Sequence, residues 1–178
     1  MPEFEFTLKF SLTGREGSID ELVERLGAAG CTDALVGIGQ PGRIGLAFTR
    51  EAHSATEAVQ SALADVRGAI PSAKLVEAAP DFVGLTDIAQ LLGCSRQNMR
   101  KLAVQANGGF PPPIHEGTPT IWHLATVLDW LQSRGNQEIE GRLRDVARIN
   151  RQLNLARELH DLDVQPASAQ DLRRLLVA

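Results

Sequence analysis

Apolar and polar residues at the start of the chain follow first a strand period and then a helix period. From Phe4 to Leu12 they alternate with period two, which predicts a strand with one buried face. Ser18 then precedes Glu21 by three positions, the capping-box pattern of a helix N-terminus. Apolar residues continue at helical spacing until Gly30. The opening thus predicts a strand followed by an amphipathic helix.

The next fifty residues repeat these signals in another order. Two short apolar runs, 32–39 and 43–50, are joined by a Gln-Pro-Gly turn and predict a hairpin. Ser54 and Glu57 mark a second helix, which stops near Pro71, and a short strand follows at 73–77. The order strand, helix, strand, strand, helix, strand is that of a ferredoxin-like βαββαβ domain, expected over residues 1–79. The fold class expected is α+β.

Residues 82–135 read as a second unit, which is mostly helical. Helical spacing predicts helices over 85–92, 95–106 and 123–132. The prolines between the second and third of these exclude a helix there. A turn at Glu116-Gly117 between the extended pieces 112–115 and 119–122 would form a wing, so a winged helix-turn-helix domain is expected.

The remaining residues, 136–178, are expected to be C-terminal helices for dimerisation or partner binding. A long polar helix is predicted from 137 to about 162, and a short one from Ser168 to Val177 after Pro166. The long helix has one apolar stripe: Ile139, Leu143, Val146, Ile149, Leu153 and Ala156. The heptad does not persist beyond it, so a continuous coiled coil is not expected.

Charge is distributed unevenly along the chain. The net charge is −4, and residues 1–81 hold 7 basic and 12 acidic side chains. Residues 82–135 hold 4 basic and 3 acidic ones, and three of the four cations lie within residues 96–101. Affinity for nucleic acid depends on locally placed cations that displace counterions, so this cluster matters more than the total. The acidic first segment suits a protein or ligand partner better.

The segment around that cluster has the residues of a helix-turn-helix. Thr86 is expected to cap the first helix, and Gly93 can adopt the left-handed backbone of a tight turn. Ser95 is expected to cap the second helix, with Met99 and Leu102 pointing into the core. Five polar side chains would then face outward or flank the core: Arg96, Gln97, Asn98, Arg100 and Lys101. Long donors on such a helix are what reading a major groove requires.

Three stretches carry a resemblance to a known family: LTDIAQLLGCSRQNMRKLA, FPPPIH and TIWHLATVLDWL. They resemble MerR-type winged helices and, more closely, the small AlpA and excisionase-like regulators of prophages. The resemblance covers about fifty residues and implies binding of double-stranded DNA. It implies that Ser95, Arg96, Gln97, Asn98 and Arg100 enter the major groove. It also implies that Lys101 lies near phosphates and that a wing over 110–122, including His115, Thr118 and Thr120, touches the flanking DNA.

The expected function is therefore that of a sequence-specific transcriptional regulator. Arg96 or Arg100 can donate two hydrogen bonds to guanine, and Gln97 or Asn98 can pair with adenine. The helix starts at Thr86 and Ser95 can hold phosphates. One such module has a small footprint, so a homodimer is expected, with the long helix from 137 as the leading seam. The alternative is a protein-interaction module, such as an antitoxin or phage-type adaptor, with autoregulatory DNA binding.

Other function classes find little support in the sequence. The four histidines share no metal-ligand spacing, and two cysteines are too few for a zinc ribbon. No catalytic constellation is evident, so no enzyme, cofactor or metal is expected. No apolar run is long enough to span a membrane and no secretory signal is seen, so a cytoplasmic protein is expected.

Overall fold

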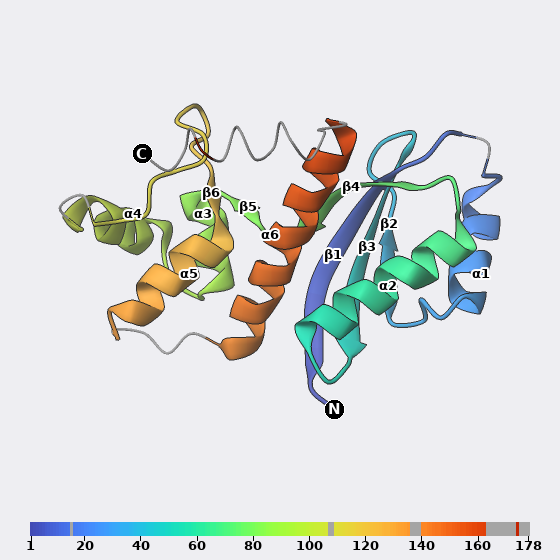
Figure 1. Cartoon of the computed structure of the whole chain (residues 1–178), viewed down its shortest axis with the longest axis horizontal. Coiled ribbons are helices and arrows are strands. Elements are labelled where there is room, and N and C mark those ends of the chain that lie inside the picture. Colours follow the sequence, from blue (N-terminus) through green and yellow to red (C-terminus); the bar gives the residue numbers. More distant parts are fainter. Residues whose placement is uncertain (15, 107–108, 136–139, 163–173, 175–178) are drawn as a thin grey trace.

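The chain folds as a mixed α+β protein, which confirms the predicted class (Figure 1). The computed structural model describes residues 1–14, 16–106, 109–135, 140–162 and 174. Those residues form six helices, a four-stranded antiparallel sheet and a two-stranded sheet. The sheet with α1 and α2 lies at one end of the long axis, and α4 lies at the other end (Figure 1).

The four-stranded sheet has the strand order β2-β3-β1-β4. Its strands are β1 (Glu3–Ser11), β2 (Ala34–Gly37), β3 (Arg43–Glu51) and β4 (Lys74–Ala79). Every second residue of β1 is buried, as the period-two pattern predicted. Phe6 and Phe48 are direct cross-strand partners, and their rings stack with centroids 5.2 Å apart. Such pairs fix the register of the central strands.

Two helices, α1 (Ile19–Ala28) and α2 (Ala55–Ala69), close the apolar face of this sheet. Ser18 and Glu21 form the predicted capping box at the start of α1. At α2 the Ser54 hydroxyl accepts from the Glu57 amide, but the Glu57 carboxylate accepts from His53 N, one residue before the cap. The second pattern is therefore only half of a capping box.

The following residues build a second apolar cluster around short elements. These are β5 (Phe82–Val83), α3 (Leu85–Leu91), α4 (Arg96–Gln105), β6 (Trp122–His123) and α5 (Leu124–Ser133). β5 and β6 pair antiparallel and were not predicted, because two residues are too few to show a period. Ile88, Met99, Leu124 and Leu128 are each fully buried in this cluster. Trp122 and Trp130 both contact Phe110 edge-on, so they belong to this core.

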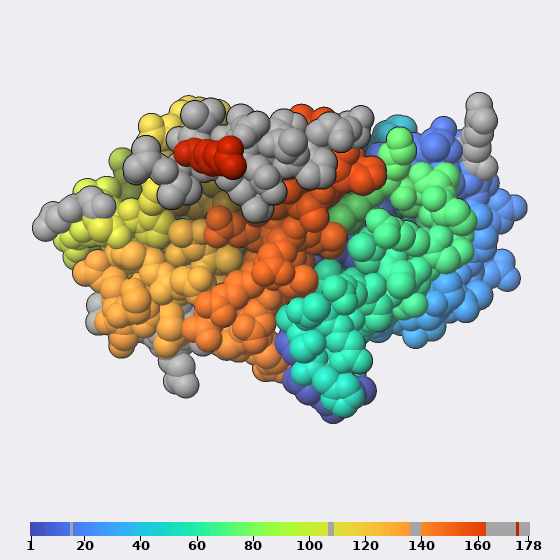
Figure 2. Space-filling view, in the orientation of Figure 1, coloured from blue at the N-terminus to red at the C-terminus, as the bar shows by residue number. Residues whose placement is uncertain are grey.

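The last described helix, α6 (Gly141–Asp161), joins the two apolar clusters. Val146 is buried in the cluster of the sheet, and its neighbour Ala147 is buried in the cluster of α3 and α5. In the space-filling view α6 runs between α2 and α5 (Figure 2). Leu143, Ile149 and Leu153 also pack onto these clusters. The first four described residues of the predicted apolar stripe thus pack inside the chain and are not available to a second copy, whereas Ala156 is exposed. A dimer through another side of this helix stays a prediction.

Two expectations concern residues that the structure does not describe. Ile139, the first residue of that stripe, lies outside the described residues. The short helix expected from Ser168 to Val177 also lies outside them, apart from Arg174.

Candidate nucleic-acid interface

α3 and α4 are held together by a tight turn and a shared apolar side. Gly93 has a φ of +63°, the left-handed conformation that was expected of it. The turn brings Ile88 and Ala89 of α3 against Met99 of α4, and all three are buried. A small residue at position 89 permits this close approach. α4 is therefore fixed by its inner side, while its outer side remains free to contact a ligand.

The starts of the two helices differ from each other in how they are capped. Ser95 caps α4 as predicted, since its hydroxyl accepts from the Asn98 amide at 3.1 Å. Thr86 does not cap α3, and that expectation is wrong. α3 starts at Leu85, its N-cap is Gly84, and the Asp87 carboxylate accepts from the Gly84 amide at 2.8 Å. Thr86 is exposed in the first turn instead.

The outer side of α4 concentrates exposed hydrogen-bond donors. Five polar residues of the N-terminal half are all exposed: Arg96, Gln97, Asn98, Arg100 and Lys101. Among the residues that the structure describes, no carboxylate forms an ion pair with these three cations. α4 also lies at the far end of the long axis from α1 (Figure 1). The acidic first segment therefore does not cover this surface.

A short hairpin follows α4 and contains the other predicted residues. Backbone hydrogen bonds join Ile121 to Ile114 and His115 at 2.9 to 3.4 Å, so the chain reverses between them. His115 and Thr118 are exposed. Thr120 is half-buried, and its hydroxyl donates to the Gly117 carbonyl, so it supports the turn. The base of the hairpin is anchored by Trp122, whose indole nitrogen donates to the Pro111 carbonyl at 3.0 Å.

A buried polar cluster connects this part of the molecule to the sheet. Asp81 is fully buried, and its carboxylate accepts from Asn154 Nδ2 and from His123 Nδ1, each at 2.8 Å. Asn154 also bonds both the amide and the carbonyl of Ala78, at 2.8 and 2.9 Å. Buried hydrogen bonds thus hold the junction between residues 1–79 and 82–135 to α6. Sequence analysis missed it, although an asparagine within an apolar stripe is a signal that could have found it.

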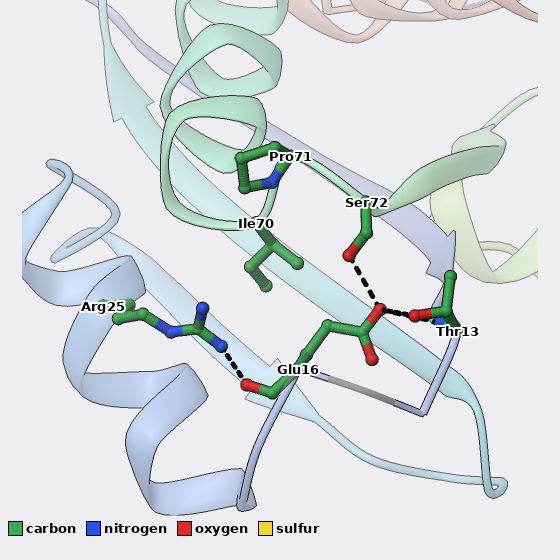
Figure 3. A pocket seen from close by; sticks show the side chains of 6 residues that line it. All are labelled: Thr13, Glu16, Arg25, Ile70, Pro71 and Ser72. Atoms are coloured by element: carbon green, nitrogen blue, oxygen red, sulfur yellow. Dashed lines mark hydrogen bonds between the residues drawn. The ribbon is translucent and has the colours of Figure 1, made fainter.

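A separate concave site lies near the end of α2 and contains the carboxylate of Glu16, which accepts three hydrogen bonds (Figure 3). Glu16 accepts hydrogen bonds from the Thr13 hydroxyl, the Thr13 amide and the Ser72 hydroxyl, each at 2.7 Å. These bonds, led by the one from the Thr13 hydroxyl, lower the pKa of Glu16 to about 2. Arg25 also donates to the Glu16 carbonyl. These contacts tie the loop before α1 to the loop before β4, so the group is structural.

The described residues offer little to other chemistry. They contain no group of three or more His, Cys, Asp or Glu side chains placed to hold a metal ion. Burial, followed by the charge of Asp65, raises the pKa of the Cys31 thiol to about 11, which suppresses the reactive thiolate. None of the described helices combines the length and apolar character that a membrane span requires. Comparison with protein-family models, curated proteins and solved structures found no match.

Proposed function

We propose that this protein binds double-stranded DNA through α4 and acts as a sequence-specific transcriptional regulator. The observation that carries the proposal is the outer side of α4. It presents to solvent two amide side chains and three cations that pair with no carboxylate among the described residues. Buried Ile88, Ala89 and Met99 hold the helix from its inner side. Exposed guanidinium and amide groups on a rigid helix match what the major groove displays.

In this proposal the helix, the turn and the hairpin have distinct roles. Arg96 and Arg100 donate to guanine edges, Gln97 and Asn98 pair with adenine, and Lys101 contacts phosphate. Ser95 and the exposed Thr86 lie at helix starts, where free amides favour anions. His115 and Thr118 touch the flanking backbone from the hairpin, with Thr120 supporting its turn.

The arrangement of elements supports a finer reading of the fold. We interpret residues 1–79 as a ferredoxin-like domain, because they have the order βαββαβ and the strand order β2-β3-β1-β4. We interpret residues 82–135 as a winged helix-turn-helix domain, with α4 as recognition helix and the 114–121 hairpin as wing. MerR-type and AlpA-like regulators have the second of these domains.

A second function, as a protein-interaction module, is favoured by one observation on α6. Leu155, Leu159 and Leu162 recur at helical spacing and are 42%, 53% and 70% exposed. In the DNA-binding proposal this stripe contacts a second copy of the chain and places two α4 helices on paired half-sites. In the alternative it contacts another protein, such as a toxin or a phage-type partner, and DNA binding is autoregulatory.

The test is direct binding to DNA. Sequences selected from a random duplex pool are labelled, and fluorescence anisotropy is measured over a salt series. We expect the affinity of the wild type to fall as salt rises, because released counterions drive phosphate contacts. Arg96→Ala is expected to weaken specific binding by about 10-fold or more, equivalent to the 1–3 kcal/mol of a bidentate base contact. Arg142→Ala, an exposed arginine on α6, is the matched control and should bind as the wild type does.

Two results would contradict the proposal. One is a pool that yields no enriched sequence and no salt-dependent binding. The other is an Arg96→Ala variant that binds like the wild type, since that would remove α4 from the interface. Light scattering on the same samples measures the oligomeric state and so separates the two roles of the α6 stripe. A dimer favours contact with a second copy, and a monomer favours the protein-interaction module.

A further inference from the structure

A groove of about 750 Å³ lies where the sheet, the end of α2 and the end of α6 meet. Its walls come from the first residues of β3 and β4, the loop around Pro71 and the last two turns of α6. Small-molecule sites in proteins enclose roughly 300–1,000 Å³, so the groove has the size of a ligand site. It lies on the sheet side of the molecule, away from α4.

Three cations on the sheet side of this groove have no acidic partner in the part of the chain that the structure describes. Arg43, Arg67 and Lys74 are all exposed, and none forms an ion pair with a carboxylate of the described residues. Residues 1–81 hold only seven basic side chains, and these three gather at one place. An otherwise acidic segment therefore presents a local positive surface here.

The sheet register brings two of these cations into one row. Ser11 of β1 is the direct partner of Arg43 on one side and of Lys74 on the other. Directly opposed residues project from the same face of a sheet. Arg43 and Lys74 are two strand spacings apart, roughly 10 Å, with the small Ser11 between them. This spacing lets two long side chains converge on one anionic group.

The α6 side of the groove adds charge that is already neutralised. Arg157 pairs with Glu158 at 3.1 Å and with Asp161 at 3.5 Å. Its Nε is buried and has no acceptor among the described residues. His160 also lines the groove, and Asp161 is the sole carboxylate among the lining residues that the structure describes. The net excess is therefore positive and comes from the sheet side.

Apolar side chains form the rest of the wall. Ala73, Leu75 and Leu153 are half-buried and pack onto the core of the sheet, and Val76 and Ala156 lie beside them. A groove meant only for phosphate or for the backbone of nucleic acid would not need this apolar surface. A ligand that fills it would have an apolar body and an anionic head.

We propose that this groove binds a small amphiphilic anion. The anionic head, a phosphate, sulfate or carboxylate, lies between Arg43 and Lys74. The apolar body bends around the start of the edge strand β4 toward Leu75 and Leu153, which face the core side of the sheet. This proposal does not depend on DNA binding by α4. The positive charge of Arg43 and Lys74 calls for an anionic group, and the apolar wall calls for an apolar body on the same ligand.

The experiment is isothermal titration calorimetry of the full chain with octyl phosphate below its micelle concentration. We expect saturable binding at one site, and at least 10-fold weaker binding by the double variant Arg43→Ala/Lys74→Ala. Inorganic phosphate should bind at least 10-fold more weakly than octyl phosphate, and octyltrimethylammonium should show no binding. Arg142→Ala is the control for loss of an exposed arginine. Thermal unfolding of each variant checks that loss of binding is not loss of fold.

Several outcomes would overturn the proposal. They are the absence of octyl phosphate binding, equal binding of the ammonium analogue, and unchanged affinity of the folded double variant. Inorganic phosphate binding as tightly as octyl phosphate would also do so, because the apolar wall would then have no role. Arg96→Ala separates this site from the DNA proposal, since it should bind octyl phosphate like the wild type. A double variant that loses duplex affinity, in a chain that ignores octyl phosphate, would make the groove a DNA contact instead.

Discussion

Arg50 in the sheet and the two arginines of α4 are used in opposite ways. In the sheet, Arg50 is only 7% exposed, and Asp33 and Asp65 each hold its guanidinium at 2.7 Å. Hydrogen bonds from Arg50 to Asp33, and then to Asp65, keep the pKa of Arg50 above its usual value. On α4, Arg96 and Arg100 are exposed and pair with no carboxylate in the described parts of the chain.

The difference separates arginines that stabilise from arginines that are available to bind. Arg50 links β3 to α2 and to the Gly30 carbonyl, so its charge is already paired within the protein and is not available to a ligand. An unpaired guanidinium in water contributes little to stability and retains its full capacity to bind an anion. Sequence alone shows both as arginines, and only the neighbours decide between the two roles.

The largest expected effect on stability is that of Arg50→Ala. It leaves Asp33 and Asp65 without their partner, and we expect the free energy of unfolding to fall by about 3 kcal/mol. Arg96→Ala should change it by less than about 0.5 kcal/mol, as for other exposed sites. Urea unfolding followed by circular dichroism measures both. Equal losses in the two variants would show that Arg50 and Arg96 contribute alike to stability.

A second prediction concerns the junction between the two ends. Asn154→Ala leaves the amide and carbonyl of Ala78 without partners inside the protein, so unfolding should become easier by about 2 kcal/mol. Gln152→Ala, at an exposed position of the same helix, is the control and should be close to neutral. A neutral Asn154→Ala would mean that water replaces the side chain and that the junction is loose.

A third prediction separates stability from binding on α4 itself. Ser95→Ala removes the cap and should cost about 1 kcal/mol. Ser95→Asp retains an acceptor, so its unfolding should match the wild type, but its negative charge should weaken duplex binding several-fold. Urea unfolding and anisotropy on the same preparations give both quantities. If Ser95→Asp binds duplex as well as the wild type, the start of α4 does not face DNA.

The smallest effect is a pH dependence at the sheet end. The pKa of Glu16 is about 2 in the folded chain and 4.5 without these contacts, so between these values the unfolded chain binds more protons. The stability that Glu16 contributes is therefore complete above about pH 4.5 and is lost as the pH falls toward 2. Glu16→Gln should narrow the difference in urea midpoint between pH 5 and pH 3. An identical pH profile would show that the three hydrogen bonds do not favour the charged carboxylate.

Much of the fold could be predicted because its elements are long enough to show a period. β1 and β3 alternate over nine residues each, and α2 carries a clear apolar face. The helix starts at Ser18, Ser54 and Ser95 could be placed because a serine hydroxyl is a cap that sequence displays. Gly84 has no side chain that could reveal it as a cap, and the hydrogen bond from its amide to the Asp87 carboxylate was not predicted. For this reason Thr86 was taken for the cap.

What could not be predicted depends on surfaces that meet only in three dimensions. The apolar stripe of α6 shows which side is buried but not what buries it, so the sequence could not distinguish contacts within the chain from contacts with a second copy. Asn150 and Asn154 lie in that buried side one turn apart. Their partners, Pro80 and Ala78, are more than sixty residues away in sequence. The α4 residues were predicted more easily because their exposure follows from helical spacing alone.

The contact of Asn154 with β4 also affects how the protein meets other copies of itself. A free strand edge offers unpaired amides and carbonyls to any extended chain, and proteins blunt such edges to avoid aggregation. The side chain of Asn154 hydrogen-bonds the amide and the carbonyl of Ala78, so α6 covers the edge of β4 at this residue. β2, at the opposite border, is only four residues long, and its Leu35 is 78% exposed. A very short edge strand also resists strand addition, so the two borders are protected in different ways, β4 by a side chain of α6 and β2 by its shortness.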